Sequence, residues 1–226
     1  FVLVAFLVAT ALYASDSMVT HGYLRMEQAS ERYILAQQSA TNLEIGSDTL
    51  TEAVRSFVVT EEFEYLQNYF TEVNETRLRD KAVANLETMM TRDSVAYGHL
   101  SEALRWSNEL MEDEYQAMKL ILSIGEYDEA LIPAVLKDFE LRPEDASRSP
   151  EEKRALALGL VYGSRYRDCK THIRNNANLC TQELINASQA ERARLNTQMN
   201  VLLGVQTVLT VALLFVVLSI VIFISG

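Results

Sequence analysis

The segment VLLGVQTVLTVALLFVVLSIVIFIS, residues 201–225, carries no charged side chain and is rich in valine, leucine and isoleucine. As an α-helix it would extend over about 37 Å, enough to cross a hydrocarbon core of about 30 Å with some tilt. The sequence therefore predicts a membrane-spanning helix over residues 201–226.

A second apolar segment, FVLVAFLVATALY, occupies residues 1–13. It would make only about 20 Å of helix, which is too short to span a bilayer by itself. Two interpretations are open: the end of a truncated first transmembrane helix over residues 1–14, or the apolar region of a signal peptide. We favour the truncated helix because no basic residue precedes the run, residues 12–14 form a poor cleavage site, and a helical pattern continues past Tyr13. We then expect the chain to be a piece of a longer protein.

All charged residues lie between Asp16 and Arg194, and with 31 acidic against 20 basic residues this stretch carries the whole net charge of −11. An acidic stretch between two apolar ends indicates a water-exposed domain over residues 15–200 that is held at a membrane. Nucleic acid is a poor partner for it, because phosphate backbones require basic surfaces. The lysine and arginine flanks that would orient the apolar helices are absent. The side of the membrane is therefore inferred from the size and acidity of the domain.

Residues that break helices are scarce, with three prolines and eight glycines in the chain. Apolar residues recur with a period of about 3.6, and no alternation typical of strands is present. Turn signals at Thr60–Glu62, at Thr91–Ser94 and within 124–149 divide this pattern. We predict helices from the membrane to Val59, from Glu61 to Met89, onward to Ser123, from Asp128 to Phe139, and from Pro150 into the second span, with Gly159 or Gly163 as a kink or an end.

The predicted fold is all-α, an elongated antiparallel four-helix bundle with a membrane-proximal stalk, flanked by transmembrane helices. The first helix would extend about 69 Å beyond the membrane, and the second and third about 45 Å each. The excess length predicts a two-helix stalk next to the membrane. The turn at Thr60 and the 124–149 connection would then both lie at the far tip.

Three stretches resemble the extracytoplasmic helical-bundle sensor domains of bacterial chemoreceptors, sensor histidine kinases and diguanylate cyclases. The first is SDTLTEAVRSFVVT (47–60), which runs on to EYLQNY (64–69), and the others are SNELMEDEYQAM (107–118) and LVYGSRYRDCKTHI (160–173). The resemblance implies a signal-input domain on the periplasmic side of a bacterial inner membrane. Such receptors commonly have a Gly-Asp turn after the position of Thr60, where this chain has Glu61 and Glu62, so the shape of that turn is left open.

Glu114 stands at the centre of an apolar stripe formed by Ser107, Leu110, Met118 and Ile121. A carboxylate on the inner face of a helix costs free energy unless it is paired or hydrogen-bonded. Glu114 therefore either fixes the register of the helices through a buried polar contact or anchors a polar ligand between them.

Five further residues join Glu114 as candidate ligand-binding residues, and counting from the turns places them in the distal part of the bundle: Arg55, Tyr65, Tyr69, Tyr166 and Lys170. One carboxylate, two cations and several tyrosines in an apolar setting suit a small polar or anionic ligand.

Other chemistry finds little support in the sequence. His21, His99 and His172 lack the partner spacing of a metal or haem site, so no metal or cofactor is predicted. No phosphate-binding loop or nucleophile motif is present, and we predict no enzyme activity for this piece. Cys169 and Cys180 would lie about 16 Å apart on a straight helix, too far to bond to one another. We interpret them as buried apolar residues, while a redox role and the compartment are left open.

These features favour a ligand-sensing receptor that works as a homodimer, because a second copy would cover the exposed stripes of the stalk. A small ligand, or a periplasmic binding protein at the tip, would shift a helix by about 1–2 Å and pass the signal to a cytoplasmic output module beyond Gly226. The alternative is a membrane-anchored structural or tethering helical protein without a ligand. A continuous apolar seam at the a and d positions would favour that alternative.

Overall fold

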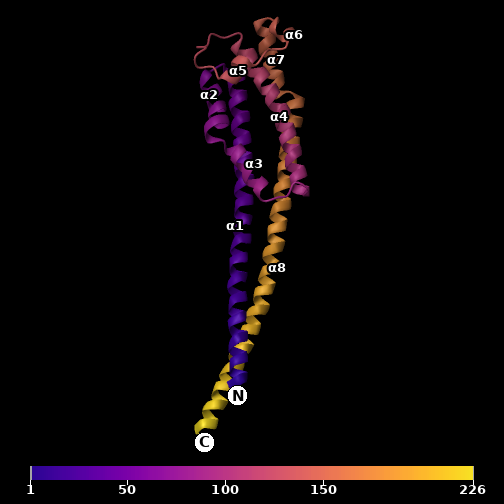
Figure 1. Ribbon diagram of the computed structural model, residues 1–226. Helices are drawn as coiled ribbons and strands as arrows, with labels where there is room; N and C mark the ends of the chain where they lie inside the picture. The colour runs from indigo at the N-terminus through magenta and orange to yellow at the C-terminus, as the bar shows by residue number, and fades with distance from the viewer. Residues whose placement is uncertain (1, 226) are drawn as a thin grey trace. The chain divides into compact units, whose positions relative to one another are not determined.

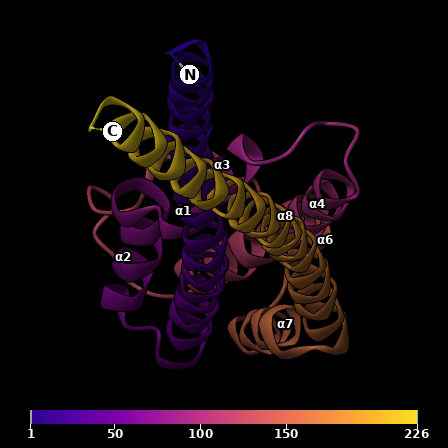
Figure 2. The ribbon, with the colours of Figure 1, turned by 90° about the horizontal axis from the view of Figure 1, so that it is seen from below.

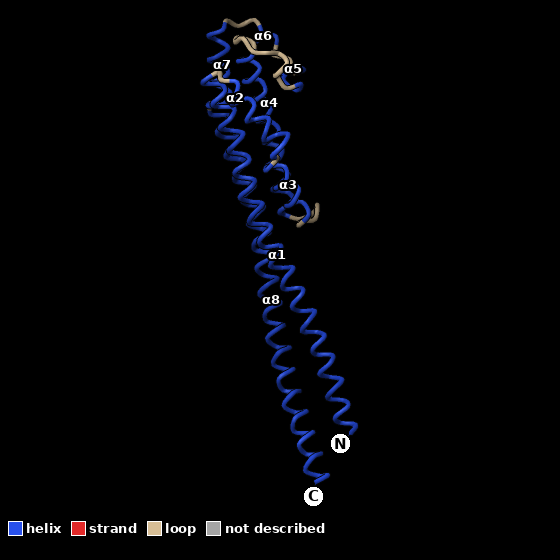
Figure 3. Tube along the Cα trace, turned by 90° about the vertical axis from the view of Figure 1, so that its left-hand side faces the viewer, coloured by secondary structure: helices blue, strands red, loops and turns tan. Residues whose placement is uncertain are grey.

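The computed structural model describes residues 2–225, and these residues are all-helical, with no β-strand among them (Figures 1 and 3). The predicted all-α class is thus confirmed. The chain divides into two compact units. One comprises residues 35–184, and the other comprises the two terminal segments, 1–34 and 185–226.

Two long helices, α1 (Val2–Thr60) and α8 (Ser164–Ser225), each run without interruption through residues of both units. Neither helix contains a proline, so nothing removes a backbone hydrogen bond from their interiors. The buried side chains of α1 recur at a spacing of about 3.5 residues, which keeps one seam buried along the helix. They include Val19, Ala29, Ala36, Leu43, Leu50, Val54 and Phe57.

Residues 35–184 share one hydrophobic core. The parts of α1 and α8 that belong to this unit enclose it together with α2 (Phe63–Thr71), α4 (Val95–Leu122) and α7 (Pro150–Tyr162). Figure 2 shows α2 on one side of α1 and α7 on the other, and α4 packs along α7. The largest fully buried side chains of this core include Phe57, Leu66, Tyr69, Met118, Leu120, Ile121 and Tyr166.

The second predicted helix, Glu61–Met89, is wrong as a single element. It consists of α2, a π-helical turn η1 (Glu72–Thr76), and α3 (Leu78–Thr88), with Arg77 in the left-handed conformation at φ 51° between them. The Glu72 side chain is buried in this break, where it accepts a hydrogen bond from the Thr76 hydroxyl and another from the Arg79 backbone N–H at 3.2 Å. Local side-chain hydrogen bonds of this kind compete with the regular helix ladder, and the apolar periodicity that predicted one helix does not report them.

The connection after α4 also differs from prediction. Instead of one helix over Asp128–Phe139, it holds two short helices, α5 (Ala134–Asp138) and α6 (Pro143–Ala146). Pro133 explains the late start, because a proline disfavours the helical conformation of the residue before it. The start of α7 is as predicted, with Ser149 forming a capping box with Glu152. Gly163 ends α7 and separates it from α8, one of the two outcomes predicted for it.

The turn between α1 and α2 forms around Glu61, which adopts a left-handed φ of 62°. This conformation costs about 1–2 kcal/mol for a residue with a side chain. The Tyr127 hydroxyl donates to the Glu61 carbonyl at 2.9 Å, and the Arg154 guanidinium donates to both carboxylate oxygens. The hydrogen bond from Arg154 also lowers the pKa of Glu61. The contacts of its side chain and its carbonyl thus hold Glu61 in the turn.

Among the described residues, the stretch Pro150–Phe223 contains a segment long and apolar enough to cross a membrane, and none of that segment is buried. This is compatible with membrane association through the C-terminal part of α8. The role of the shorter apolar run at the start of α1 stays a prediction.

Gly46 on α1 should prove essential to the packing of the broken second helix. A Cβ added at Gly46 would lie 2.6 Å from the Arg79 backbone N and 2.9 Å from a Glu72 carboxylate oxygen. Gly46→Ala should therefore lower the free energy of unfolding by about 1–3 kcal/mol in chemical denaturation. Gly98→Ala on α4 is the matched control, because its Cβ would meet open space, and it should raise stability by about 0.5–1 kcal/mol. Equal effects of the two changes would contradict the close approach at Gly46.

Candidate functional site

Glu114 on α4 lies inside the core, with only 5% of its surface exposed. One carboxylate oxygen accepts a hydrogen bond from the Tyr69 hydroxyl of α2, and the other accepts one from the Tyr166 hydroxyl of α8, each at 2.7 Å. The apolar stripe correctly predicts that Glu114 faces inward. The two hydrogen bonds therefore connect α4, which carries Glu114, to α2 and to α8.

Burial is the main influence on the ionisation of this cluster. Desolvation raises the pKa of Glu114, while the hydrogen bonds from the two tyrosines and the more distant charges of Lys170 and Arg79 oppose that rise. Burial and the neighbouring carboxylate also raise the pKa of Tyr69 and of Tyr166 far above their usual value. Both tyrosines therefore remain protonated and act as donors, which is the state that the geometry requires.

Arg55 on α1 contacts the junction between α7 and α8. Its Nε donates to the Val161 carbonyl at 2.9 Å, in the last turn of α7, where helical carbonyls lack partners within the helix. Its guanidinium also lies over the rings of Tyr162 and Tyr166, 4.8 Å and 4.9 Å from their centroids. Arg55 is thus packed against the same tyrosine that binds Glu114.

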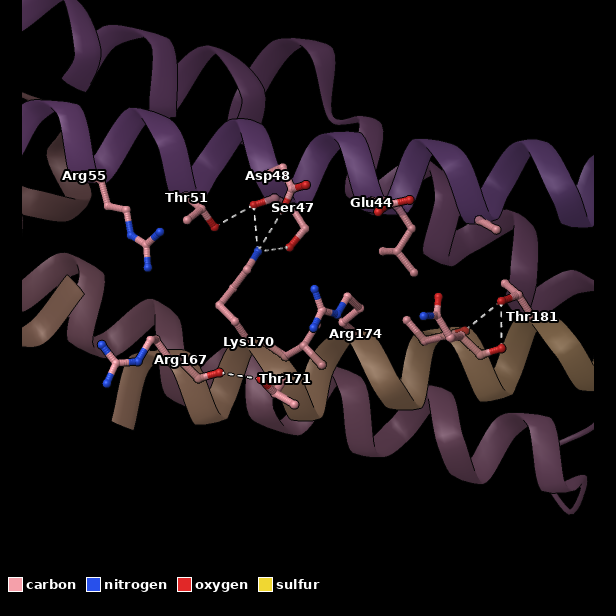
Figure 4. A pocket seen from close by; sticks show the side chains of 15 residues that line it. Glu44, Ser47, Asp48, Thr51, Arg55, Arg167, Lys170, Thr171, Arg174 and Thr181 are labelled. Carbon is pink, nitrogen blue, oxygen red and sulfur yellow. Dashed lines mark hydrogen bonds and ion pairs between the residues drawn. The ribbon is translucent and has the colours of Figure 1, made fainter. Parts of the chain in front are cut away.

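A groove of about 380 Å³ opens between α1 and α8 beside this cluster. Its charged lining residues are four cations and two carboxylates, a formal excess of two positive charges: Arg55, Arg167, Lys170, Arg174, Glu44 and Asp48. In Figure 4, Arg55 and Arg174 point into the space between the two helices. A positive recess in a chain of net charge −11 favours an anionic occupant.

Lys170 reaches across the groove from α8 to α1 (Figure 4). Its Nζ donates to the Ser47 hydroxyl at 2.7 Å and to the Ser47 carbonyl at 3.2 Å, and it lies 3.4 Å from an Asp48 carboxylate oxygen. Burial lowers the pKa of Lys170, and Asp48 opposes this shift. Lys170 is therefore a cation whose partners on α1 are mostly neutral oxygens, which an entering anion can replace or join.

Thr51 connects the groove with the buried carboxylate. Thr51 lines the groove, and its hydroxyl oxygen lies 3.4 Å from the Tyr166 hydroxyl oxygen, which in turn donates to Glu114. A contact at Thr51 in the groove therefore lies two side chains away from Glu114, which connects α4 to α2 and α8.

The structure brings together most of the residues singled out from the sequence. Tyr69, Glu114 and Tyr166 form one network, Arg55 packs on Tyr166, and Lys170 lines the same groove as Arg55. The exception is Tyr65, which is partly buried at the edge of the core, and no described residue hydrogen-bonds its hydroxyl.

Sequence reasoning missed most residues of the groove, among them Ser47, Thr51, Arg167 and Arg174. The two arginines could have been found, because they stand three residues before and four residues after Lys170 and so share its face of the helix. Ser47 and Thr51 gave no such signal, since a small hydroxyl on a long helix most often bonds its own backbone, as Thr51 also does with the Ser47 carbonyl.

The histidines and cysteines have other surroundings. His172 stacks on Trp106 with ring centroids 4.5 Å apart, and His99 lies 3.3 Å from the Asn176 side chain. Cys169 and Cys180 are free and buried. Within residues 2–225, no group of histidine, cysteine, aspartate and glutamate side chains is arranged to hold a metal ion.

Comparisons of the chain with protein-family models, with curated proteins and with solved structures give no match.

Removing one hydrogen-bond donor to Glu114 should lower the free energy of unfolding. Tyr166→Phe leaves the buried carboxylate with a single hydrogen bond, and a hydrogen bond to a charged group contributes about 1.5–3 kcal/mol. Urea denaturation should show a loss of that size. Tyr65→Phe removes the same atom from a tyrosine without a described hydroxyl partner, and should change stability by less than about 0.5 kcal/mol. A Tyr166→Phe protein as stable as the wild type would show that the network does not hold the helices.

Proposed function

We propose that this chain is the ligand-sensing input domain of a bacterial transmembrane signalling receptor, with residues 15–200 on the periplasmic side. The observation that carries the proposal is the basic groove between α1 and α8, which connects through Thr51 and Tyr166 to the buried Glu114. In support, α8 continues from this groove into a segment long and apolar enough to cross a membrane.

The helices of the 35–184 unit favour a four-helix bundle as the sensing module. The core receives side chains from α1, α2, α4 and the α7–α8 pair. In a four-helix bundle, α7 and α8 together would count as the fourth helix. The remaining lengths of α1 and α8 would then form the membrane-proximal stalk and the flanking transmembrane helices. As a receptor of this build, the chain is expected to act as a homodimer, in which the second copy covers exposed apolar residues of the stalk such as Leu24 and Ile34.

The charges of the groove define the class of ligand. Arg55, Lys170 and Arg174 present cationic donors to one recess, and guanidinium groups bind carboxylates and phosphates through two parallel hydrogen bonds. A volume of about 380 Å³ suits a small molecule. The proposed ligand is therefore a small organic or inorganic anion.

The signal would be a relative shift of α1 and α8. An anion that contacts Lys170 on α8 competes with the Ser47 and Asp48 contacts that tie Lys170 to α1. It would bind the two arrangements of the helix pair with different affinity, which is the requirement for moving an equilibrium between them. Because both helices are continuous, a shift of about 1–2 Å could reach an output module on the cytoplasmic side.

The alternative function, a tether without a ligand, would need a continuous apolar seam between the helices. Apolar residues recur along the buried face of α1, but polar positions interrupt them. The Ser15 and Ser39 hydroxyls are buried without a partner in the described structure, and Thr51 is also buried. These interruptions and the buried Glu114 favour the receptor over the tether.

Thermal unfolding of the chain in neutral detergent, with acetate, succinate or citrate added, tests the proposal. An anion at about ten times its Kd stabilises by about 1.4 kcal/mol, which should raise Tm by roughly 3–6 °C. Lys170→Gln and Arg174→Gln should each abolish most of that rise, because each removes a cation from the groove.

Arg105→Gln is the matched control, because Arg105 lies on α4, outside the groove, and pairs with Glu102 and Glu109. It should leave the rise intact. The proposal fails if none of the three anions stabilises the wild type, or if all three variants respond as the wild type does.

A further inference from the structure

A second polar groove lies between α1 and α8 within the unit formed by the terminal segments. Its volume is about 390 Å³, and its floor is formed by the buried side chains of Ala29 and Leu195. The walls carry three arginines, one carboxylate and two amides: Arg25, Arg32, Arg194, Glu191, Gln28 and Gln198.

The lining residues repeat on the two helices with the same spacing. Arg25, Gln28 and Arg32 occupy positions i, i+3 and i+7 of α1, and Glu191, Arg194 and Gln198 do so on α8. Positions with this spacing share one helix face, so each helix presents a row of long polar side chains to the same recess.

The three arginines have no ionic partner in the described part of the chain. No carboxylate lies within 4.0 Å of the Arg25, Arg32 or Arg194 guanidinium, although acidic residues outnumber basic ones in the sequence. By contrast, the neighbouring Arg192 lies over the Tyr33 ring, 5.4 Å from its centroid, and does not line the groove. With Glu191 included, the groove has a formal charge of +2, which leaves it suited to a mono- or dianion.

We propose that this groove binds a phosphate group. Guanidinium groups match the geometry of phosphate oxygens, and the amides of Gln28 and Gln198 can add neutral donors. This site is distinct from the groove at Lys170 and does not depend on the sensing function proposed for it.

An anionic phospholipid headgroup is the favoured source of the phosphate. Arg194 precedes the apolar run that begins at Val201 by seven residues, which is about 10 Å of helix. The Cβ atoms of α1 tilt toward its N-terminus, so Arg25 and Arg32 lean toward the apolar start of that helix. This source, unlike the site itself, rests on the membrane insertion that the proposed function includes.

Two arms of one experiment separate the sources. In the first, the chain is placed in lipid nanodiscs at about 0.15 M salt, where nonspecific surface attraction is largely screened, and its preference for spin-labelled phosphatidylglycerol over spin-labelled phosphatidylcholine is measured. In the second, the chain in neutral detergent is titrated with inorganic phosphate, and binding is followed by calorimetry. Wild type, Arg32→Gln, Arg194→Gln and the control Arg192→Gln are compared in both arms, with helix content checked by circular dichroism.

We expect phosphatidylglycerol to be preferred at least threefold by the wild type and by Arg192→Gln, and the preference to fall toward one in Arg32→Gln and Arg194→Gln. Phosphate binding that is lost in the same two variants, without a lipid preference, would support the site with a soluble phosphate as its ligand. The proposal is overturned if the wild type binds neither probe, or if Arg192→Gln loses as much binding as Arg194→Gln does.

Discussion

The hydrogen bonds from Tyr69 and Tyr166 to the Glu114 carboxylate are the interaction on which the rest of the 35–184 unit depends. A buried carboxylate is tolerated only when its oxygens are satisfied, and here one donor comes from α2 and one from α8. An apolar residue at position 114 would need no hydroxyl groups from the two neighbouring helices. The carboxylate instead accepts only the arrangement that presents both hydroxyls, so it fixes the relative positions of α2, α4 and α8.

The same hydrogen bonds connect the groove at Lys170 to the buried core through Tyr166. Tyr166 belongs to both environments, because its hydroxyl binds Glu114 while Arg55 and Thr51 approach it from the groove side. In the proposed sensing function, an anion that drew Arg55 or Lys170 toward itself would act on residues that surround the buried Glu114. Such coupling would require no movement of the core as a whole, only a choice between two positions of the α1–α8 pair.

The helical class, the inward position of Glu114 and the start of α7 could be predicted from apolar periodicity and capping residues, because both are local signals. The break in the second helix could not, since it depends on Glu72 folding back on Arg79 and on the close approach of Gly46. The same reason applies to the groove: Arg167 and Arg174 share a face with Lys170, but only the pairing of α8 with α1 shows that this face opposes Ser47 and Thr51. Counting from the turns places Tyr65 with the other candidates, but Tyr65 lies at the edge of the core, apart from the hydrogen-bond network of Glu114.

The most direct test of the hydrogen-bonded Glu114 carboxylate is the pH dependence of unfolding for the wild type and for Glu114→Gln. Because burial raises the pKa of Glu114 above its usual value of 4.5, the folded state binds its proton at higher pH than the unfolded state does. Wild-type stability relative to the variant should therefore rise as pH falls from 7 toward about 4.5, and level off below that. A difference between the two proteins that stays constant from pH 7 to 4.5 would contradict a buried carboxylate at the centre of this structure.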